Sequence, residues 1–335
     1  MSSKTTAALA ALAALAMAAM APAWAAPDAW LPYDKITPRA MWIDKIKEGL
    51  YVIRGPVRMD CMRGCRPGEK GDGVLHEAGD VAVRVTPEGV ILVDSKFPEM
   101  VDDILALVRT VTDKPVKYLI NSHYHNDHAS GDSRLLAQGV TLVQQRWLRE
   151  RYEVDKLEAG SATIAFGDYA SVHLGGVVVE AYNFAPGGHT RGDVITYFPD
   201  LKVVHMGDLV IEGMPHIDYR GGNGSAVGFV NEIYDLLKLD IDVAIPGHGQ
   251  LMTKDQVYAY VRKVELMNER MKEAVRRGVP VDKVVPELGL ESLGWAHSAS
   301  TATFLAGDVP PYYAEMAAVL KAANPPPWKP RPAQP

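Results

Sequence analysis

Short apolar runs separated by turn residues dominate the first part of the chain. Residues from about Trp42 to Ile53 include a partly alternating, β-branched stretch that suits a strand. The segments 81–85 and 90–93 predict two further strands, joined by the turn tripeptide Pro87-Glu88-Gly89. Between these regions, residues 55–80 are rich in glycine, proline and charge, and the length of this segment indicates a functional loop rather than a simple connector.

The pattern changes from strand to helix after Pro98. Apolar residues at positions 101, 104, 105, 108 and 111 recur at the spacing of one helix face. Lys114-Pro115 ends this helix, and residues 116–120 predict a short buried strand. A strand, a helix and a strand in this order indicate an α/β fold.

The same α/β pattern continues toward the C-terminus. The capping-box pair Thr253 and Gln256 predicts the start of a long helix, which runs to about Arg277 and stops at Gly278. Residues 279–323 then predict two short helices, and we expect no regular structure in the proline-rich tail 324–335. The remaining predicted elements are strands near 140–143, 177–182, 194–197, 203–205 and 243–245 and a helix over roughly 226–237.

The first 25 residues follow a different pattern. Lys4 precedes an apolar run from residue 7 to 21, which is followed by Pro22 and the small-residue triplet Ala23-Trp24-Ala25. This order is typical of a secretory signal peptide, so we expect residues 1–25 to be cleaved and the protein to be periplasmic or secreted. An uncleaved membrane anchor is the alternative, but the run is shorter than the about 20 residues that a spanning helix needs. We expect no stable membrane insertion after cleavage.

Composition and charge narrow the class of substrate. The chain has 335 residues, of which 47% are hydrophobic and 23% charged, and these values are typical of a globular protein. The formal net charge is -6 and no basic stripe is visible, so we expect a small-molecule substrate and no nucleic-acid partner. The sequence leaves the oligomeric state open.

The two cysteines, Cys61 and Cys65, lie close together in the segment 55–80. In an exported protein such a pair favours a disulfide, and two free thiols or a metal or redox role are the alternatives. The small loop that this disulfide would close would stabilise the fold only modestly.

The strongest chemical signal is the run His123-Tyr124-His125-Asn126-Asp127-His128, directly after the predicted strand 116–120. Imidazole nitrogens and carboxylate oxygens bind zinc at about 2.0–2.2 Å. Three histidines and one aspartate are more donors than one four-coordinate ion takes from so short a stretch. The run therefore predicts two neighbouring metal ions.

Three further donors lie downstream, each at or just after the end of a predicted strand or in its following loop. They are His189 in Gly-Gly-His-Thr, Asp208 in Met-Gly-Asp and His248 in Pro-Gly-His-Gly. A glycine precedes each donor, and glycine lets the backbone approach closely at a crowded site. We expect the other histidines to be surface or core residues without a metal: His76, His173, His205, His216 and His297.

The ordered motifs H-x-H-x-D-H, G-H-T, G-D and P-G-H-G resemble those of the metallo-β-lactamase-fold hydrolases over roughly residues 45–255. The resemblance implies an αββα four-layer sandwich, in which two mixed β-sheets lie face to face with helices outside, and a C-terminal helical extension over 256–323. It also implies that Asp94 does not bind the metals itself but supports the loop that carries the metal ligands. By position it implies a first metal held by His123, His125 and His189, a second held by Asp127, His128 and His248, and a bridging Asp208.

The resemblance further implies a hydrolase with two metal ions per chain, most readily zinc, with iron or manganese as alternatives. A hydroxide that bridges the two ions would attack the carbonyl of an ester, lactone, thioester or amide. Asp127 would orient this hydroxide and move its proton. The alternative functions are an iron-dependent, persulfide dioxygenase-like enzyme and a β-lactamase of a cysteine-free type.

Asp208 stands where the zinc β-lactamases of this fold place a cysteine, which disfavours that branch. It is similar to the aspartate of glyoxalase II and lactonases, but residues 209–216 lack the Cys-Gly and basic residue with which glyoxalase II binds glutathione. The export signal and the long helix after P-G-H-G are similar to exported hydrolases found beside sulfur-oxidation or quinoprotein pathways. His216, Tyr219 and Arg220 are candidates either for lining the substrate pocket or for a solvated turn.

Overall fold

The computed structural model describes residues 41–55, 57–59, 75–155, 163–184, 187–295, 301 and 304–323. The expected signal peptide, both cysteines and the proline-rich tail lie outside these residues. Within the described ranges, no helix combines the length and the apolar character that crossing a bilayer requires.

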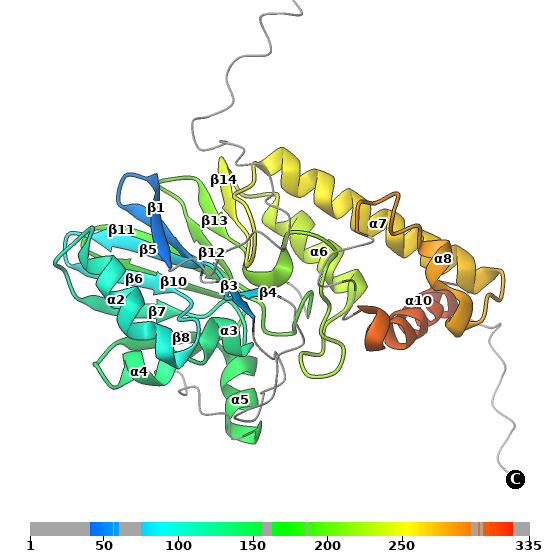
Figure 1. The fold of residues 1–335 in the computed structure, drawn as a ribbon, viewed down its shortest axis with the longest axis horizontal. Helices are drawn as coiled ribbons and strands as arrows, with labels where there is room; N and C mark the ends of the chain where they lie inside the picture. Colours follow the sequence, from blue (N-terminus) through cyan, green and yellow to red (C-terminus); the bar gives the residue numbers. More distant parts are fainter. Residues whose placement is uncertain are drawn as a thin grey trace, which may run out of the picture. The chain divides into compact units, whose positions relative to one another are not determined.

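Two mixed β-sheets form the centre of the fold (Figure 1). The first sheet has the strand order β1-β2-β5-β6-β7-β8-β9, in which β6 to β9 are parallel and the other neighbours antiparallel. The second has the order β10-β11-β12-β13-β14, in which β13 and β14 are parallel. The strands of the first sheet are Trp42–Lys47 (β1), Leu50–Arg54 (β2), Val81–Thr86 (β5), Gly89–Val93 (β6), Val116–Ile120 (β7), Thr141–Gln145 (β8) and Ile164–Phe166 (β9). Those of the second sheet are Tyr169–Leu174 (β10), Val177–Tyr182 (β11), Ile195–Phe198 (β12), Val203–His205 (β13) and Val243–Ile245 (β14), and a small separate ribbon pairs Val57–Met59 (β3) with Leu75–Glu77 (β4).

Helices and short helical turns connect these strands. The longest described helices are α7 (Lys254–Arg276), α10 (Val309–Ala323), α6 (Ala226–Leu236), α5 (Arg146–Asp155) and α2 (Val101–Arg109). The shorter ones are Pro98–Met100 (η2), Asn126–Ala129 (α3), Asp132–Leu136 (α4), Gly207–Leu209 (η3), Val281–Lys283 (η4), Val285–Leu288 (α8) and the π-helical turn Phe304–Asp308 (η5).

Alternating side chains along the strands divide the core of the described residues into three large apolar clusters, beside a small fourth one around Ala129 and Tyr152. On β6, Ile91 and Val93 pack in the cluster between the two sheets, whereas Val90 and Leu92 pack with α2 on the other face. This is the alternation expected of a strand that is buried on both faces. The third cluster joins the outer face of the second sheet to α6, α7 and α10. The αββα sandwich implied by the sequence is therefore confirmed, with α2 and α6 on opposite sides of the paired sheets (Figure 1).

Most predicted elements are confirmed, but the structure adds the strands β3, β4, β9 and β10 and the short helices α3 and α4, and it departs from the prediction in three further respects. The stretch from Trp42 to Ile53 forms two antiparallel strands rather than one, because Gly49 adopts φ +69° at the turn between them. The last helix, α10, has 15 residues and is longer than predicted, because Tyr312 and Met316 give it a buried face that the sequence pattern does not reveal. The sequence prediction also omitted α5, whose many charged residues mask its one buried side.

Two hydrogen bonds at the start of α7 stabilise this helix. Thr253 Oγ1 accepts a hydrogen bond from Gln256 N at 3.3 Å, and Gln256 Oε1 accepts one from Thr253 N at 2.8 Å, which confirms the predicted capping box. We predict that Thr253→Ala lowers the free energy of unfolding by about 1 kcal/mol, because an amide at the helix start loses its acceptor. Urea denaturation would measure this change, and Thr253→Ser should keep most of the stability. An unchanged midpoint for Thr253→Ala would contradict the prediction.

Candidate metal centre

The candidate metal ligands all lie at one edge of the two sheets, where strands end. His123, His125, Asp127 and His128 follow β7, Asp208 lies in η3 just after β13, and His248 follows β14. His189 lies between β11 and β12. Because β6 and β7 are parallel, as are β13 and β14, their carboxyl ends meet at common edges. The structure thus brings all seven side chains together in two groups, although they span more than 120 positions of the chain.

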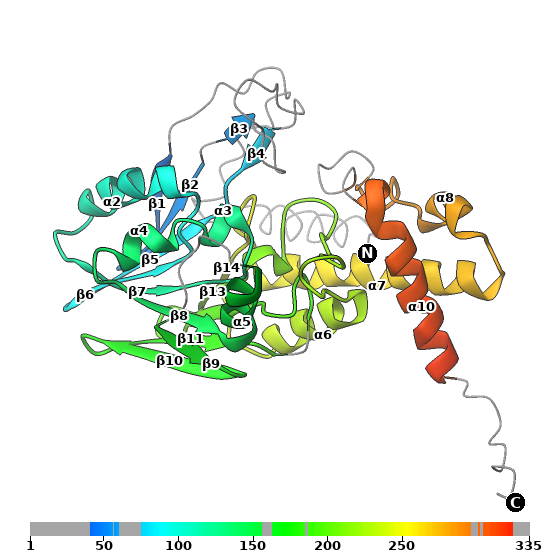
Figure 2. The ribbon, with the colours of Figure 1, turned by 90° about the horizontal axis from the view of Figure 1, so that it is seen from below.

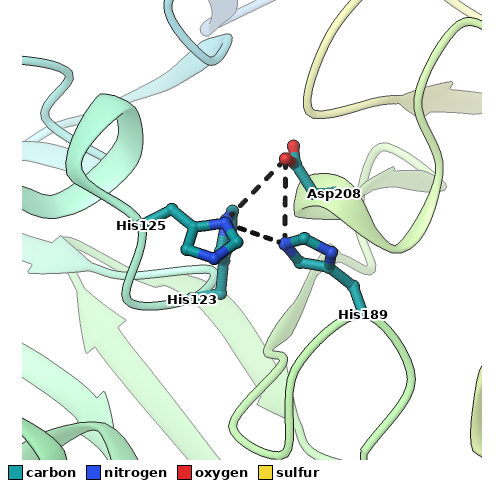
Figure 3. Close-up of side chains that lie close together, drawn as sticks. All are labelled: His123, His125, His189 and Asp208. Atoms are coloured by element: carbon teal, nitrogen blue, oxygen red, sulfur yellow. Dashed lines mark hydrogen bonds and ion pairs between the residues drawn. The ribbon is translucent and has the colours of Figure 1, made fainter. Parts of the chain in front are cut away.

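The first group contains His123, His125, His189 and Asp208 (Figure 3). His125 Nδ1 lies 3.1 Å from His189 Nε2. Asp208 Oδ2 lies 3.8 Å from the Nε2 atoms of both His123 and His189. The ligand atoms of the group therefore face a common point.

The second group contains Asp127, His128 and His248. His248 Nε2 lies 3.2 Å from both His128 Nε2 and Asp127 Oδ2. The other oxygen of Asp208, Oδ1, lies 3.1 Å from His128 Nε2 and 3.4 Å from His248 Nε2. One oxygen of Asp208 thus faces each group, which is the arrangement of a bridging carboxylate.

The acceptors beside the outer nitrogens of His125 and His189 indicate that the inner nitrogens present lone pairs to one another. His125 Nε2 lies 3.0 Å from Asp218 Oδ2, and His189 Nδ1 lies 2.7 Å from the carbonyl oxygen of His216. Both partners are acceptors, so these outer nitrogens carry the protons. The inner atoms, His125 Nδ1 and His189 Nε2, are then two lone pairs 3.1 Å apart, a contact that is repulsive without a cation between them.

The outer nitrogens of His123 and His128 also donate hydrogen bonds to fixed acceptors. Ser122 Oγ donates to Asp94 Oδ2 at 2.7 Å, so it accepts a hydrogen bond from His123 Nδ1 at 3.0 Å. His128 Nδ1 donates to Asp94 Oδ2 at 2.8 Å. Both Nε2 atoms therefore turn inward, and that of His123 is buried without a hydrogen-bond partner.

These donors fit divalent metal ions. Two ligand atoms at about 2.0–2.1 Å from a tetrahedral zinc ion lie about 3.3 Å apart, close to the separations of 3.1 and 3.2 Å between the paired imidazole nitrogens. Burial lowers the pKa of His189 to about 3, so its neutral form is the stable one. Burial would also lower the pKa of His128, but the Asp208 and Asp127 carboxylates raise it to about 10, which shows that the second group favours a positive charge. The residues therefore match the chemistry of a two-metal site.

Asp94 supports this centre through hydrogen bonds to Ser122 and His128, as the resemblance implies. It is fully buried and has the unusual φ of +68°. Its Oδ1 accepts from Ser122 N at 2.7 Å, and its Oδ2 accepts from Ser122 Oγ and His128 Nδ1. One carboxylate thereby orients a histidine of each group.

Asp218 is the important residue that sequence reasoning missed. Its Oδ2 accepts hydrogen bonds from His125 Nε2 at 3.0 Å and from Tyr124 Oη at 2.5 Å, and its Oδ1 accepts from the amides of Arg220 and Gly221. Burial alone would raise the pKa of Asp218, but the hydrogen bonds from His125 and Tyr124 hold it well below its usual range. An aspartate two residues after His216 in a glycine-rich loop was the only signal available.

The three candidates for pocket lining have different positions. The ring of His216 stacks on that of His125, with centroids 5.9 Å apart, and lies 5.1 Å from that of His189. Tyr219 Oη instead donates to Glu315 on α10, and the exposed Arg220 packs against Gly307. His216 is therefore the one of the three that borders the centre directly.

Two of the remaining histidines lie apart from the centre. His205 is buried, with Nε2 2.9 Å from the carbonyl oxygen of Asp80 and Nδ1 accepting from the amide of Gly207. His173 is exposed beside Ser171. Neither belongs to either group of ligand candidates, and the side chains of His76 and His297 lie outside the described part of the chain.

Two known hydrolases are similar in sequence to parts of this chain. A hydroxyacylglutathione hydrolase from Synechococcus sp. (strain JA-3-3Ab) is 29% identical over 122 residues, which cover 35% of this chain and 44% of that protein. A linear primary-alkylsulfatase from Pseudomonas sp. (strain ATCC 19151) is 25% identical over 269 residues, which cover 61% of this chain and 48% of that protein. The chain thus spans less than half the length of these two relatives.

Solved structures and a family model point to the same fold. A metallo-β-lactamase from Pontibacter korlensis superposes with a TM-score of 0.57 at 19% identity, covering 68% of this chain and 99% of that one. The model of the metallo-β-lactamase superfamily matches residues 80–248, a range that begins just after β4 and ends at His248. The chain belongs to the metallo-β-lactamase superfamily, and it carries His and Asp side chains that could hold metal ions.

Proposed function

We propose that this protein is an exported dinuclear zinc hydrolase that acts on the carbonyl group of a small ester, lactone, thioester or amide. The observation that carries this proposal is the convergence of four imidazole nitrogens, from His123, His128, His189 and His248, on the two oxygens of Asp208. Export rests on the signal-peptide pattern of residues 1–25 and places the enzyme in the periplasm or outside the cell.

The side chains have distinct parts in this function. His123, His125 and His189 would hold the first ion, Asp127, His128 and His248 the second, and Asp208 both. When bound, the two ions would supply Lewis acidity and lower the pKa of water to about 7. The Asp127 side chain is partly exposed, at 16%, whereas that of Asp208 is 7% exposed. Asp127 would orient the attacking water and accept its proton.

The relatives suggest two substrate classes. The hydroxyacylglutathione hydrolases favour a thioester or related acyl substrate, but residues 209–216 lack the glutathione-binding features of glyoxalase II. The alkylsulfatase matches a longer part of this chain, 61%, which favours a sulfate ester as a second candidate. A substrate screen should therefore include lactones, thioesters, β-lactams, phosphodiesters and alkyl sulfates.

We predict that the purified protein contains two zinc ions per chain and loses its hydrolytic activity on exhaustive chelation. Elemental analysis of the intact protein would measure the metal, and zinc added back to the chelated protein should restore activity. A single iron per chain would favour the dioxygenase-like alternative. Full activity after complete metal removal would contradict the proposal.

We predict that Asp208→Asn reduces the metal content to one ion or fewer and lowers kcat/KM by about 10³-fold, because a neutral amide cannot bridge two cations. Asp240→Asn is the matched control, since Asp240 is an exposed aspartate paired with Lys202. Elemental analysis and steady-state kinetics measure the two effects. Two tightly bound ions in Asp208→Asn would show that this carboxylate does not bridge them.

We predict that Asp218→Asn weakens metal binding at the first group by about 10- to 100-fold, because His125 loses the carboxylate that fixes its tautomer. The second group should keep its affinity, since His128 is oriented by Asp94 instead. Competition of the apo protein with a chromophoric chelator would resolve the two affinities. A binding curve that matches wild type would remove Asp218 from the centre.

A further inference from the structure

The loop of residues 214–225 forms one wall of the first metal group. His189 Nδ1 donates to the carbonyl oxygen of His216 at 2.7 Å, and Asp218 N donates to the carbonyl oxygen of His189 at 2.9 Å. Ser225 N donates to the carbonyl oxygen of Gly188 at 3.0 Å, and the Asp218 carboxylate holds His125. A movement of this loop would therefore displace two candidate ligands.

The other side of the same loop is held by the C-terminal extension. Glu315 on α10 accepts hydrogen bonds from Tyr219 Oη at 2.7 Å and from Ser225 Oγ at 2.5 Å. Burial and the Glu315 carboxylate raise the pKa of Tyr219, so the phenol keeps the proton that it donates. Arg220, between these two anchors, packs on Gly307, where an added Cβ would lie 1.6 Å from its guanidinium.

Glu315 also completes the N-terminus of α6, which follows the loop directly. Its carboxylate accepts from the amides of Ala226 at 2.9 Å and Val227 at 3.3 Å, and Ser225 Oγ accepts from that of Gly228. A negative charge at the start of a helix is stabilised by the helix dipole. The last residues of the loop and the first of α6 are thus fixed by one side chain from a distant helix.

The position of α10 is itself fixed, so that Glu315 acts as a rigid anchor. Tyr312 Oη donates to Asn268 Oδ1 on α7 at 2.6 Å, and Asn268 Nδ2 donates to the carbonyl oxygen of Ala226 at 3.2 Å. Tyr312 and Met316 are buried in the cluster that α10 shares with α6 and α7. Figure 2 shows α10 crossing α7 at this contact.

We propose that Glu315 is a positioning residue of the metal centre: through Tyr219 and Ser225 it holds the 214–225 loop, and through that loop it sets His125 and His189. The inference rests on the proposed function, in that these two histidines bind the first metal. It extends that function to a helix that lies beyond the region matched by the superfamily model, which ends at residue 248.

The expected size of the effect follows from the length of the chain of contacts. Loss of a partner in direct contact with a ligand costs about 10- to 100-fold in metal affinity. Glu315 acts through one further residue, so Glu315→Gln should weaken zinc binding at the first group by about tenfold, the lower end of that range. Zinc affinity at the second group, which the loop does not contact through these bonds, should stay within about twofold of wild type.

The test compares the full-length protein with four variants: Glu315→Gln, Tyr219→Phe, the double variant that combines these two, and a control. Glu315→Gln removes the carboxylate. Tyr219→Phe removes the hydrogen bond from Tyr219 Oη to Glu315, while the link through Ser225 Oγ and the cap on α6 remain. Glu273→Gln is the matched control, because Glu273 is an exposed glutamate on α7 paired with Arg276. Zinc titration of each apo protein against a chromophoric chelator gives the two affinities, and thermal melting reports stability separately. Both Glu315→Gln and Tyr219→Phe should weaken the first affinity selectively, the control neither, and the double variant should be no weaker than Glu315→Gln.

The outcomes separate this inference from the proposed function. If wild type binds two zinc ions and both variants bind them with wild-type affinities, Glu315 has only a structural part and the inference is overturned. An equal loss at both groups that parallels a lower melting temperature would overturn it as well. If Glu315→Gln fails to fold, Tyr219→Phe decides the question alone. Failure of wild type itself to bind zinc would overturn the proposed function first.

Discussion

The centre of this molecule depends on lone pairs that repel one another unless cations lie between them. His125 Nδ1 and His189 Nε2 are 3.1 Å apart, and both rings have their protons on the far side, bound to fixed acceptors. Neither ring can turn to relieve the contact without breaking a buried hydrogen bond. The scaffold thus holds a repulsive arrangement that a bound cation would stabilise, so metal binding would be coupled to folding.

The two sheets are built so that this arrangement costs little backbone strain elsewhere. Donors from the first sheet and donors from the second meet across the sandwich edge, and the approach is close enough to require glycine. A Cβ on Gly247 would lie 2.0 Å from Asp208 Oδ1, and one on Gly79 would lie 2.1 Å from the His128 ring. Backbone strain occurs at the buried Asp94, whose φ lies in the left-handed region. Three hydrogen bonds to its carboxylate compensate this strain.

The sequence was sufficient for the features that are local in the chain. Strands such as β7 and β11 have apolar runs of the right length, and the donors stand in short motifs with glycine, so both could be recognised without a structure. Asp218 and Glu315 could not, because each acts on a residue about 90 positions away or more and neither lies in a distinctive motif. The length of α10 was missed for the same reason: its buried face is defined by α7, not by its own periodicity.

This division between local and distant contacts bears on how substrate selection can change in such a fold. The candidate ligands are fixed by strand ends and by buried carboxylates such as Asp94, so they leave little freedom for variation. The loop of residues 214–225 beside His125 differs from these ligands. Its position depends on contacts with α10, which lies outside the region that the superfamily model matches. His216 lies on this loop with its ring against His125, so a shift of the loop would move this ring together with His125 and His189 and reshape the pocket at the first group. Under the proposed function, the sheet edge would supply the reaction, and the C-terminal extension, through Glu315 and the loop, would act on the first metal group and the pocket beside it.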